Sequence, residues 1–155
     1  MPHVAETQEV SFHVRAATAR DLQGVVALDR DITGLAKPEY WSDIFERYVD
    51  RGRNRFFIVA EVEQTIAGYI IGEVRAWEFG SPPCGWIFGI TVKPDVRLGG
   101  VGAKLYEAIT ARFRKSEVTK IRTMLARDNT LLMSFFRSQG MMAGPFIELE
   151  TDLDG

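Results

Sequence analysis

The segment that most constrains the fold is an apolar stretch followed by a glycine-rich loop and a helical pattern, over residues 85–115. Residues 85–92 are nearly all apolar, which is typical of a strand buried on both faces, and Pro94 ends it. From Gly100 to about Lys115 apolar residues recur every four positions, which predicts a helix with one buried stripe. The stripe consists of Val101, Leu105, Ile109 and Phe113. With the strand expected over 120–125, the segment predicts a strand–helix–strand unit.

The loop between this strand and this helix is suited to binding an anion. Gly99, Gly100 and Gly102 let the backbone approach a phosphate closely, and Arg97 adds a cation. The first N–H groups of a helix have no partner within the helix, and the helix dipole places partial positive charge there. The sequence therefore predicts an anion cradle at the start of this helix.

Two well-known phosphate-binding loops do not fit these residues. A Walker A loop needs a Gly-Lys-Ser/Thr sequence at its end, and none follows here. The dinucleotide fingerprint needs a third glycine three residues after Gly102, where Leu105 stands. A tight turn with no ligand is the remaining alternative.

The other segments alternate between strand and helix patterns. Period-two alternation or β-branched and aromatic enrichment predicts strands over 10–15, 56–62, 65–77 and 146–152. Helices are expected from Thr18 to Ile32, from Pro38 through an aromatic stripe to Val49, and from Asn129 to about Ser138. Gly68 and Gly72, inside the longest strand, indicate a bulge or close packing.

These elements predict an α/β (α+β) fold. Antiparallel hairpins at the start and strand–helix alternation at the end imply a mixed, mostly antiparallel sheet of about six to seven strands with helices on both faces. We expect a flexible tail over residues 1–9 and one domain over residues 10–155.

Composition excludes several classes of function. The formal net charge of -2 argues against a nucleic-acid partner held by bulk charge. Cys84 is the only cysteine, so no intrachain disulfide forms and no zinc cluster is expected. No apolar stretch approaches the ~20 residues of a membrane helix, and no membrane association is expected. We expect a cytoplasmic protein.

Two motifs resemble one known family. Arg97-x-x-Gly100-x-Gly102 matches the Arg/Gln-x-x-Gly-x-Gly/Ala signature of GNAT acetyltransferases, and the preceding residues 90–94 look like the central strand of that family. A second family signature is similar to residues 129–141, with an Asn, an aromatic residue, a Gly and an apolar residue at matching spacing. These are Asn129, Phe136, Gly140 and Met141. The chain thus resembles a GNAT superfamily N-acetyltransferase over nearly its whole length.

The resemblance implies acetyl-CoA as the cofactor, with CoA as the product. The backbone of Ile90, Thr91 and Val92 would bind the pantetheine arm as an added strand. The loop would hold the pyrophosphate, with Asn129 and Phe136 completing the site. The loop residues are Arg97, Leu98, Gly99, Gly100, Val101, Gly102 and Ala103. Strands 85–92 and 120–125 would splay apart around the thioester, and no metal is needed.

The expected proton donor is missing. Many GNAT enzymes resemble one another in having a Tyr where this chain has Phe136, and Phe has no hydroxyl. Water, Ser134 or Tyr69 could protonate the leaving thiolate, or the thiolate could leave unprotonated. The alternative is a catalytically silent CoA-binding or regulatory GNAT-like domain. A small interaction module with no cofactor is a third hypothesis.

Glu73 is the candidate general base. A carboxylate on an apolar strand facing a cleft can take a proton near neutrality. The structural alternative is that Glu73 faces solvent or pairs with Arg75 or Arg122. Further carboxylates are Asp31, Glu148 and Glu150. A covalent mechanism through Cys84 is not expected, because no His lies near it in sequence.

The acceptor is expected to be a small-molecule or peptide amine. The resemblance places it near the first two helices, the loop over 33–37 and the last strands. Aromatic side chains for its walls are Tyr40, Trp41, Trp77 and Trp86. Family analogy also raises a homodimer.

Overall fold

The computed structural model describes residues 11–154, so the tail expected over residues 1–9 lies outside the described part. The chain forms two compact units, residues 1–124 and residues 125–155. The first unit contains the sheet and three of the α-helices, and the second contains one α-helix and an extended segment.

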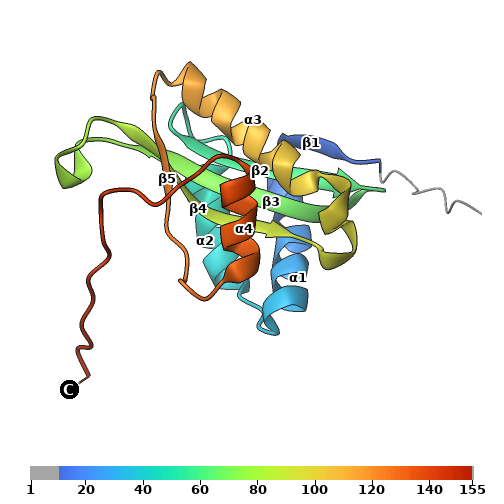
Figure 1. Cartoon of the computed structure of the whole chain (residues 1–155). Coiled ribbons are helices and arrows are strands. Elements are labelled where there is room, and N and C mark those ends of the chain that lie inside the picture. The colour runs from blue at the N-terminus through green and yellow to red at the C-terminus, as the bar shows by residue number, and fades with distance from the viewer. Residues whose placement is uncertain (1–10, 155) are drawn as a thin grey trace, which may run out of the picture. The chain divides into compact units, whose positions relative to one another are not determined.

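One five-stranded sheet organises the first unit (Figure 1). Its strands lie in the order in which they occur along the chain. They are β1 (His13–Ala16), β2 (Arg55–Val62), β3 (Thr65–Arg75), β4 (Cys84–Val92) and β5 (Ile121–Thr123). The first four pair antiparallel, and β5 pairs parallel to β4. The expected mixed, mostly antiparallel sheet is therefore confirmed, with five strands in the described residues rather than about six to seven.

The strand expected over residues 146–152 is wrong for this structure. Described residues 139–154 contain no strand. The period-two pattern identifies a segment that is able to pair, but a strand also needs a neighbouring edge that accepts its backbone hydrogen bonds. Residues 146–152 do alternate between apolar and polar side chains, but no strand of the described chain pairs with them.

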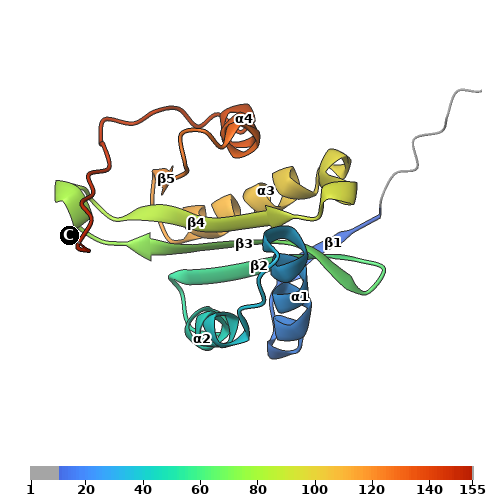
Figure 2. The ribbon, with the colours of Figure 1, turned by 90° about the horizontal axis from the view of Figure 1, so that it is seen from below.

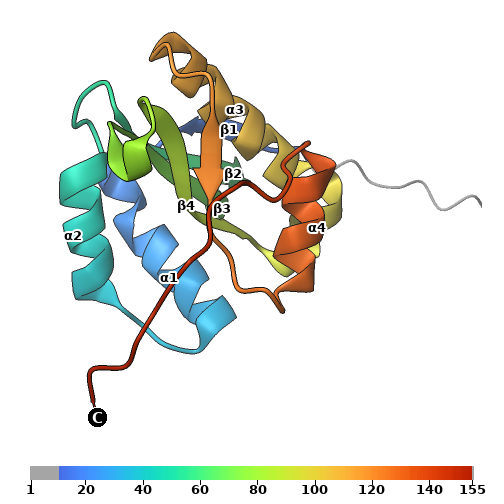
Figure 3. The ribbon, with the colours of Figure 1, turned by 60° about the vertical axis from the view of Figure 1, so that its left-hand side comes forward.

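The helices cover both faces of the sheet, as expected. Helices α1 (Leu22–Thr33) and α2 (Pro38–Tyr48) lie on one face, and α3 (Val101–Lys115) lies on the other (Figure 2). Figure 3 shows α1 and α2 side by side. In the second unit, α4 (Thr130–Ser138) begins at the expected cap, since the Asn129 side chain accepts a hydrogen bond from the Leu132 N–H at 3.1 Å.

The start of α1 is held by Thr18 and Asp21. The Thr18 N–H donates to the Asp21 carboxylate at 2.8 Å, within a short 3-10 turn over Ala19–Asp21. Arg15 donates to the same carboxylate at 2.7 Å, and this hydrogen bond holds the pKa of Asp21 below its ordinary value. The cap thereby also ties β1 to the first helix.

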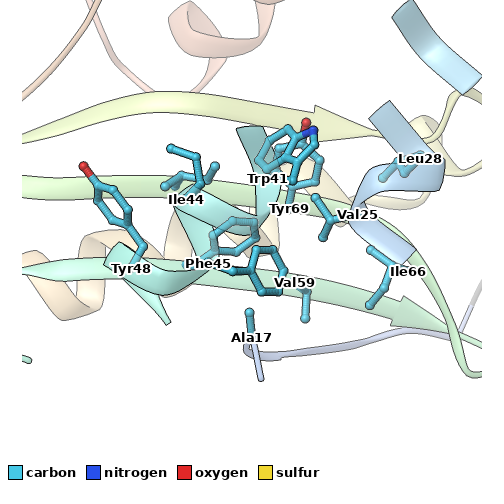
Figure 4. Close-up of a cluster of buried hydrophobic side chains, with 12 residues drawn as sticks. Ala17, Val25, Leu28, Trp41, Ile44, Phe45, Tyr48, Val59, Ile66 and Tyr69 are labelled. Carbon is cyan, nitrogen blue, oxygen red and sulfur yellow. The ribbon is translucent and has the colours of Figure 1, made fainter. Parts of the chain in front are cut away.

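The aromatic stripe of α2 packs into the core between the helices and the sheet (Figure 4). Trp41 meets Tyr69 of β3 edge-on, with ring centroids 5.1 Å apart, and Phe45 meets Phe57 of β2 at 4.8 Å. Such pairs add to the free energy gained by burying their apolar area. Plain core packing therefore accounts for most of the stripe.

On the other face of the sheet, α3 packs closely against glycines of β3 and β4. The predicted stripe Val101, Leu105, Ile109 and Phe113 is almost fully buried. A Cβ at Gly72 would stand 2.6 Å from the Trp86 carbonyl oxygen and 2.8 Å from Ile109, and a Cβ at Gly85 would stand 2.8 Å from the Phe113 ring. Gly68 likewise lies under Leu105. These contacts show close packing, and a bulge lies beside Gly72 as well.

We expect Gly72→Ala to destabilise the protein. Its Cβ meets a backbone oxygen that cannot move independently, and such overpacking costs about 1–3 kcal/mol. Gly144→Ala is the matched control, because its Cβ would meet nothing within 4 Å. Chemical denaturation of both variants measures the difference in the free energy of unfolding. Equal stabilities would contradict the tight seat of α3.

Candidate active site

Strand β4 separates from β5 where it bulges. Ile87 lies opposite Gly72 of β3 and Gly89 lies opposite Ile71, so Phe88 is an extra residue in β4. The parallel ladder with β5 ends at the same point, with Ile87 opposite Thr123. The Thr123 hydroxyl donates to the Ile87 carbonyl at 2.7 Å and closes the ladder. The pairing of β4 with β5 therefore ends at the bulge, and the splaying around a thioester stays a prediction.

Beyond the bulge, β4 presents an open backbone edge within the first unit. The Lys93 N–H donates to the Ala67 carbonyl of β3 at 2.7 Å, which fixes the phase of the antiparallel ladder. Because hydrogen-bonding direction alternates along a strand, the N–H and C=O groups of Ile90 and Val92 point away from β3. The family resemblance implies that a pantetheine arm binds along this edge.

Arg97 connects this edge to the glycine-rich loop. Its Nε donates to the Val92 carbonyl at 3.0 Å, and its side chain is otherwise exposed. The loop itself is a 3-10 turn over Pro94–Gly99, which contains Leu98 and is anchored by the buried Val96. Arg97 thus supports the strand end in addition to carrying charge.

The glycine-rich loop leads directly into the start of α3, as the sequence predicts. Gly100 has φ +81, a left-handed conformation that favours glycine, and a Cβ there would meet nothing within 4 Å. The first hydrogen bond of the helix runs from the Lys104 N–H to the Gly100 carbonyl at 3.1 Å. The N–H groups of Val101, Gly102 and Ala103 come before the donor of this bond, in the first turn of the helix, and the open glycine gives a phosphate room to approach them. These residues fit the phosphate end of a coenzyme A thioester.

Two further predicted cofactor residues lie in the second unit. Asn129 caps α4, and Phe136 is a buried residue of that helix whose ring centroid lies 5.3 Å from that of Phe135. Ser134, one of the alternative proton donors, is exposed on α4. The roles of Asn129 and Phe136 toward the cofactor stay predictions.

Glu73 is held in an ion-pair network on the α2 face of the sheet. Its carboxylate lies 3.0 Å from Arg75 and 3.8 Å from Arg55. Burial, together with a hydrogen bond to Glu73, raises the pKa of Tyr48. Glu73 lies opposite Trp86 of β4, two residues before the bulged Phe88. The pairing with Arg75 agrees with the structural alternative, and the network still places Glu73 beside the bulge.

A second polar cluster on the same face was not predicted. The Asp29 carboxylate of α1 is 6% exposed and accepts the Trp41 indole N–H at 3.0 Å, and Lys37 Nζ lies 3.0 Å from it. Tyr69 is hydrogen-bonded to the Thr91 side chain of β4, and burial raises the pKa of Tyr69 to about 12. The only signal in the sequence was an acidic residue four positions after Val25, on the apolar face of α1.

The other candidates differ in exposure. Trp41 belongs to the core, Tyr40 is half-exposed, and Trp77 lies exposed in the turn between β3 and β4. The Trp86 ring lies under the Arg75 guanidinium, 5.4 Å from it. Cys84 is buried at the start of β4, with Arg122 donating to its Sγ at 3.6 Å. A buried thiol of this kind is a poor nucleophile.

Two negative findings apply to the described residues. Among residues 11–154, no three His, Cys, Asp or Glu side chains gather as a possible metal site. Within the same part of the chain, no helix has the length and apolar character needed to cross a bilayer.

The sequence identifies the family. The model of the acetyltransferase (GNAT) family matches residues 22–141, which is more than half of the chain. The chain therefore belongs to the acetyltransferase (GNAT) family, and the resemblance seen in the two motifs is confirmed. Its class is that of acetyl-CoA-dependent acyltransferases, as expected. No curated protein is significantly similar to the chain in sequence.

Solved structures share the fold at low sequence identity. The aminoglycoside N-acetyltransferase AAC(6')-Iy in complex with CoA is 14% identical with a TM-score of 0.81, covering 92% of this chain and 95% of that one. AAC(6')-Ih from Acinetobacter baumannii is 15% identical with a TM-score of 0.79, covering 94% and 100%. A transcriptional regulator from Bacillus halodurans C-125 is 18% identical with a TM-score of 0.78, covering 92% and 100%. At these identities the likeness shows the GNAT fold.

We expect Gly100→Ala to weaken acetyl-CoA binding by about tenfold or more. The methyl group would occupy the open space at the cradle and strain a left-handed residue by about 1–2 kcal/mol. Gly34→Ala is the control, since Gly34 has φ +78 and an equally open Cβ position but lies between α1 and α2. Calorimetric titration with acetyl-CoA measures both. Equal affinities in the two variants would remove the cradle from the binding site.

Proposed function

We propose that this protein transfers the acetyl group of acetyl-CoA to a primary amine of a small-molecule acceptor, by direct attack in a ternary complex. One observation carries the proposal: the β4 bulge, the end of the β4–β5 ladder and the glycine cradle follow one another along a single segment. A strand edge that leads directly into a phosphate cradle suits a long ligand with a phosphate group. The reaction would draw on the cytoplasmic pool of acetyl-CoA.

The residues of this segment have distinct proposed roles. The backbone of Ile90, Thr91 and Val92 would hold the pantetheine arm, and the open amides among them would polarise the thioester carbonyl. The loop from Arg97 to Ala103 would hold the pyrophosphate through its N–H groups. Asn129 and Phe136 would contact the cofactor from the second unit. Acetyl-CoA supplies the activated acyl group, so the protein needs to orient two substrates and to move protons.

The acceptor is proposed to bind on the α1 and α2 face of β4. Phe88 is 40% exposed there, beside Tyr48, with ring centroids 5.2 Å apart. The carboxylates of Asp29 and Glu73 lie on the same face, and carboxylates attract an amine that arrives as a cation. Among the structural neighbours, AAC(6')-Iy has been solved with a bisubstrate analogue that joins CoA to acetylneamine. This neighbour supports a small polar amine over a peptide.

Glu73 is proposed as the group that accepts the amine proton, directly or through water. It lies next to the bulge, where β4 leaves β5. Its carboxylate lies within ion-pair distance of Arg75 and Arg55, which fix its position. A purely structural Glu73 would affect stability and leave the pH dependence of turnover unchanged.

We expect Glu73→Gln to lower turnover by about tenfold or more while the affinity for acetyl-CoA stays the same, because a general base contributes about 10²–10⁴-fold. The acidic limb of the pH–rate profile should also disappear. Glu78→Gln is the control, since Glu78 also contacts Arg75, at 3.7 Å, but is more exposed. Unchanged turnover in Glu73→Gln would assign the residue to the ion-pair network alone.

A catalytically silent CoA-binding domain is the second candidate, and Phe136 is the observation that favours it. Without a hydroxyl, this side chain cannot protonate the leaving thiolate. The two candidates differ in thiol release from acetyl-CoA over a panel of aminoglycosides, polyamines and amino acids. We expect release with at least one polar amine, and mass spectrometry should find the acetylated product.

Thermal unfolding with saturating acetyl-CoA separates the remaining outcomes. A clear rise in the midpoint without any turnover would favour the silent domain, because a ligand that binds the native state must stabilise it. A midpoint that does not move would reject both candidates and favour an interaction module without a cofactor.

A further inference from the structure

The indole N–H of Trp86 is a buried donor without an acceptor. Its Nε1 atom is shielded from solvent and has no hydrogen-bond partner, alone among the buried and half-buried side chains that the structure describes. An indole nitrogen can only donate, and an unpaired buried donor keeps the full free-energy cost of leaving water. Such exceptions are rare in native proteins, so this N–H requires an explanation.

The neighbours of the Trp86 ring do not supply an acceptor. The Arg75 guanidinium lies over the ring, 5.4 Å from its centroid, and the Phe79 ring lies 6.1 Å away. A guanidinium has donors only, and a phenyl side chain has no acceptor oxygen or nitrogen. The Glu73 carboxylate, opposite Trp86 on β3, faces Arg75 and Arg55. The acceptor is therefore a molecule outside the chain, which is either water or a ligand.

The position of Trp86 favours a ligand. Trp86 precedes the bulged Phe88 by two residues, about 7 Å along β4. Residues directly opposite each other share a face of the sheet, and Glu73, opposite Trp86, is hydrogen-bonded to Tyr48 of α2. Phe88 contacts the same Tyr48 ring. The unpaired donor therefore lies on the face proposed for the acceptor, several bond lengths from an amine that reacts near the bulge.

The charges around Trp86 favour a neutral oxygen on that ligand. Arg75 forms ion pairs with Glu73 and Glu78, at 3.0 and 3.7 Å. Arg55 lies 3.8 Å from Glu73. Two cations thus face two carboxylates, which leaves no net charge to attract a further anion. A hydroxyl oxygen accepts the indole proton without a counter-charge, so the position fits an amine that also carries a hydroxyl group.

The turn beside Trp86 is strained. Residues 76–83 join β3 to β4 (Figure 1), and Phe79 of this turn contacts the Trp86 ring. Trp77 has φ 62 and Phe79 has φ 55, which are left-handed conformations that bulky side chains rarely adopt. Strain of this kind concentrates at ligand clamps and switch segments. Opening of the turn would relieve the strain and uncover the indole N–H.

We propose that the Trp86 indole N–H binds a hydroxyl group of the acceptor amine, and that the turn over residues 76–83 is a lid that uncovers it. This inference rests on the proposed acetyl transfer, because it names the chemistry of the acceptor in that reaction. Trp86 determines specificity, since it contacts a group remote from the reacting amine. An amine with a suitably placed hydroxyl is preferred over a plain alkylamine, which would leave the donor unpaired.

Pairs of acceptors that differ by one hydroxyl test the recognition. The pairs are aminopentanol with pentylamine, and kanamycin B with its deoxy analogue tobramycin. In at least one pair we expect kcat/KM of the wild type to be about fivefold to tenfold higher for the member with the hydroxyl, which is the effect of one neutral hydrogen bond. Trp86→Phe should reduce this ratio to about one, because it removes the donor.

Trp77→Phe is the matched control for this ratio. It also replaces an indole by a phenyl group, but Trp77 is 71% exposed, so the ratio should stay that of the wild type. Equal kcat/KM values within both pairs in the wild type, or a ratio that Trp86→Phe leaves unchanged, would overturn the recognition. Acetyl transfer itself would stand in either case.

Nuclear magnetic resonance of the indole N–H groups tests the same contact without turnover. The chain has three Trp residues, and the Trp86 signal is the one that Trp86→Phe removes. With CoA bound, we expect the hydroxyl-bearing member of a pair to shift this signal and the other member to leave it in place. Such a shift without turnover would support the recognition and reject acetyl transfer. A signal that responds to neither member would assign the donor to a trapped water and overturn the recognition.

Solvent exchange of the Trp86 indole proton tests the lid. Phe79→Gly removes the ring that contacts Trp86 and places a glycine where a left-handed conformation is required. We expect exchange to become about tenfold faster or more, because less of the chain shields the proton. Glu117→Gly is the control, since Glu117 also has a left-handed φ of 63 but lies between α3 and β5. Equal exchange rates in Phe79→Gly and the wild type would overturn the lid.

Discussion

The seat of α3 on the glycines of β3 and β4 is the contact on which the rest of the first unit depends. At Gly72 a single added carbon would stand within 3 Å of a carbonyl oxygen and of two side chains of α3. The helix can therefore lie close to the sheet, and the four-residue stripe of α3 fills the space that the missing side chains leave. Because α3 begins directly after the loop that follows β4, this seat also sets where its first amides lie relative to the end of that strand.

The bulge at Phe88 has two effects from one extra residue. It shifts the pairing of β4 with β3, and it coincides with the last pair between β4 and β5. A bulge bends and twists a strand more strongly than regular pairing does, and the second half of β4 has no pair with β5. The shortness of β5 has the same effect, since a longer β5 would cover the edge proposed for the cofactor.

The sequence predicted those features that depend on neighbours along the chain. The stripe from Val101 to Phe113 and the cap at Asn129 each follow from local spacing and local conformation. The sequence offered Arg75 as one alternative partner of Glu73, but it did not predict Arg55 or the buried Asp29, because these depend on strand register and on how α1 meets α2. Residues 146–152 illustrate the same limit. Their alternating pattern shows that they are able to form a strand, but it does not show whether a neighbouring strand is available to pair with them.

The hydrogen bond from Arg97 to the Val92 carbonyl gives the open edge of β4 a defined end. A peptide-like ligand lying along that edge meets Ile90 with both backbone groups directed toward it, but at Val92 it meets a carbonyl that already accepts a guanidinium proton. In the proposed complex, the Arg97 side chain would therefore mark the far end of the edge and help to position an extended molecule lengthwise.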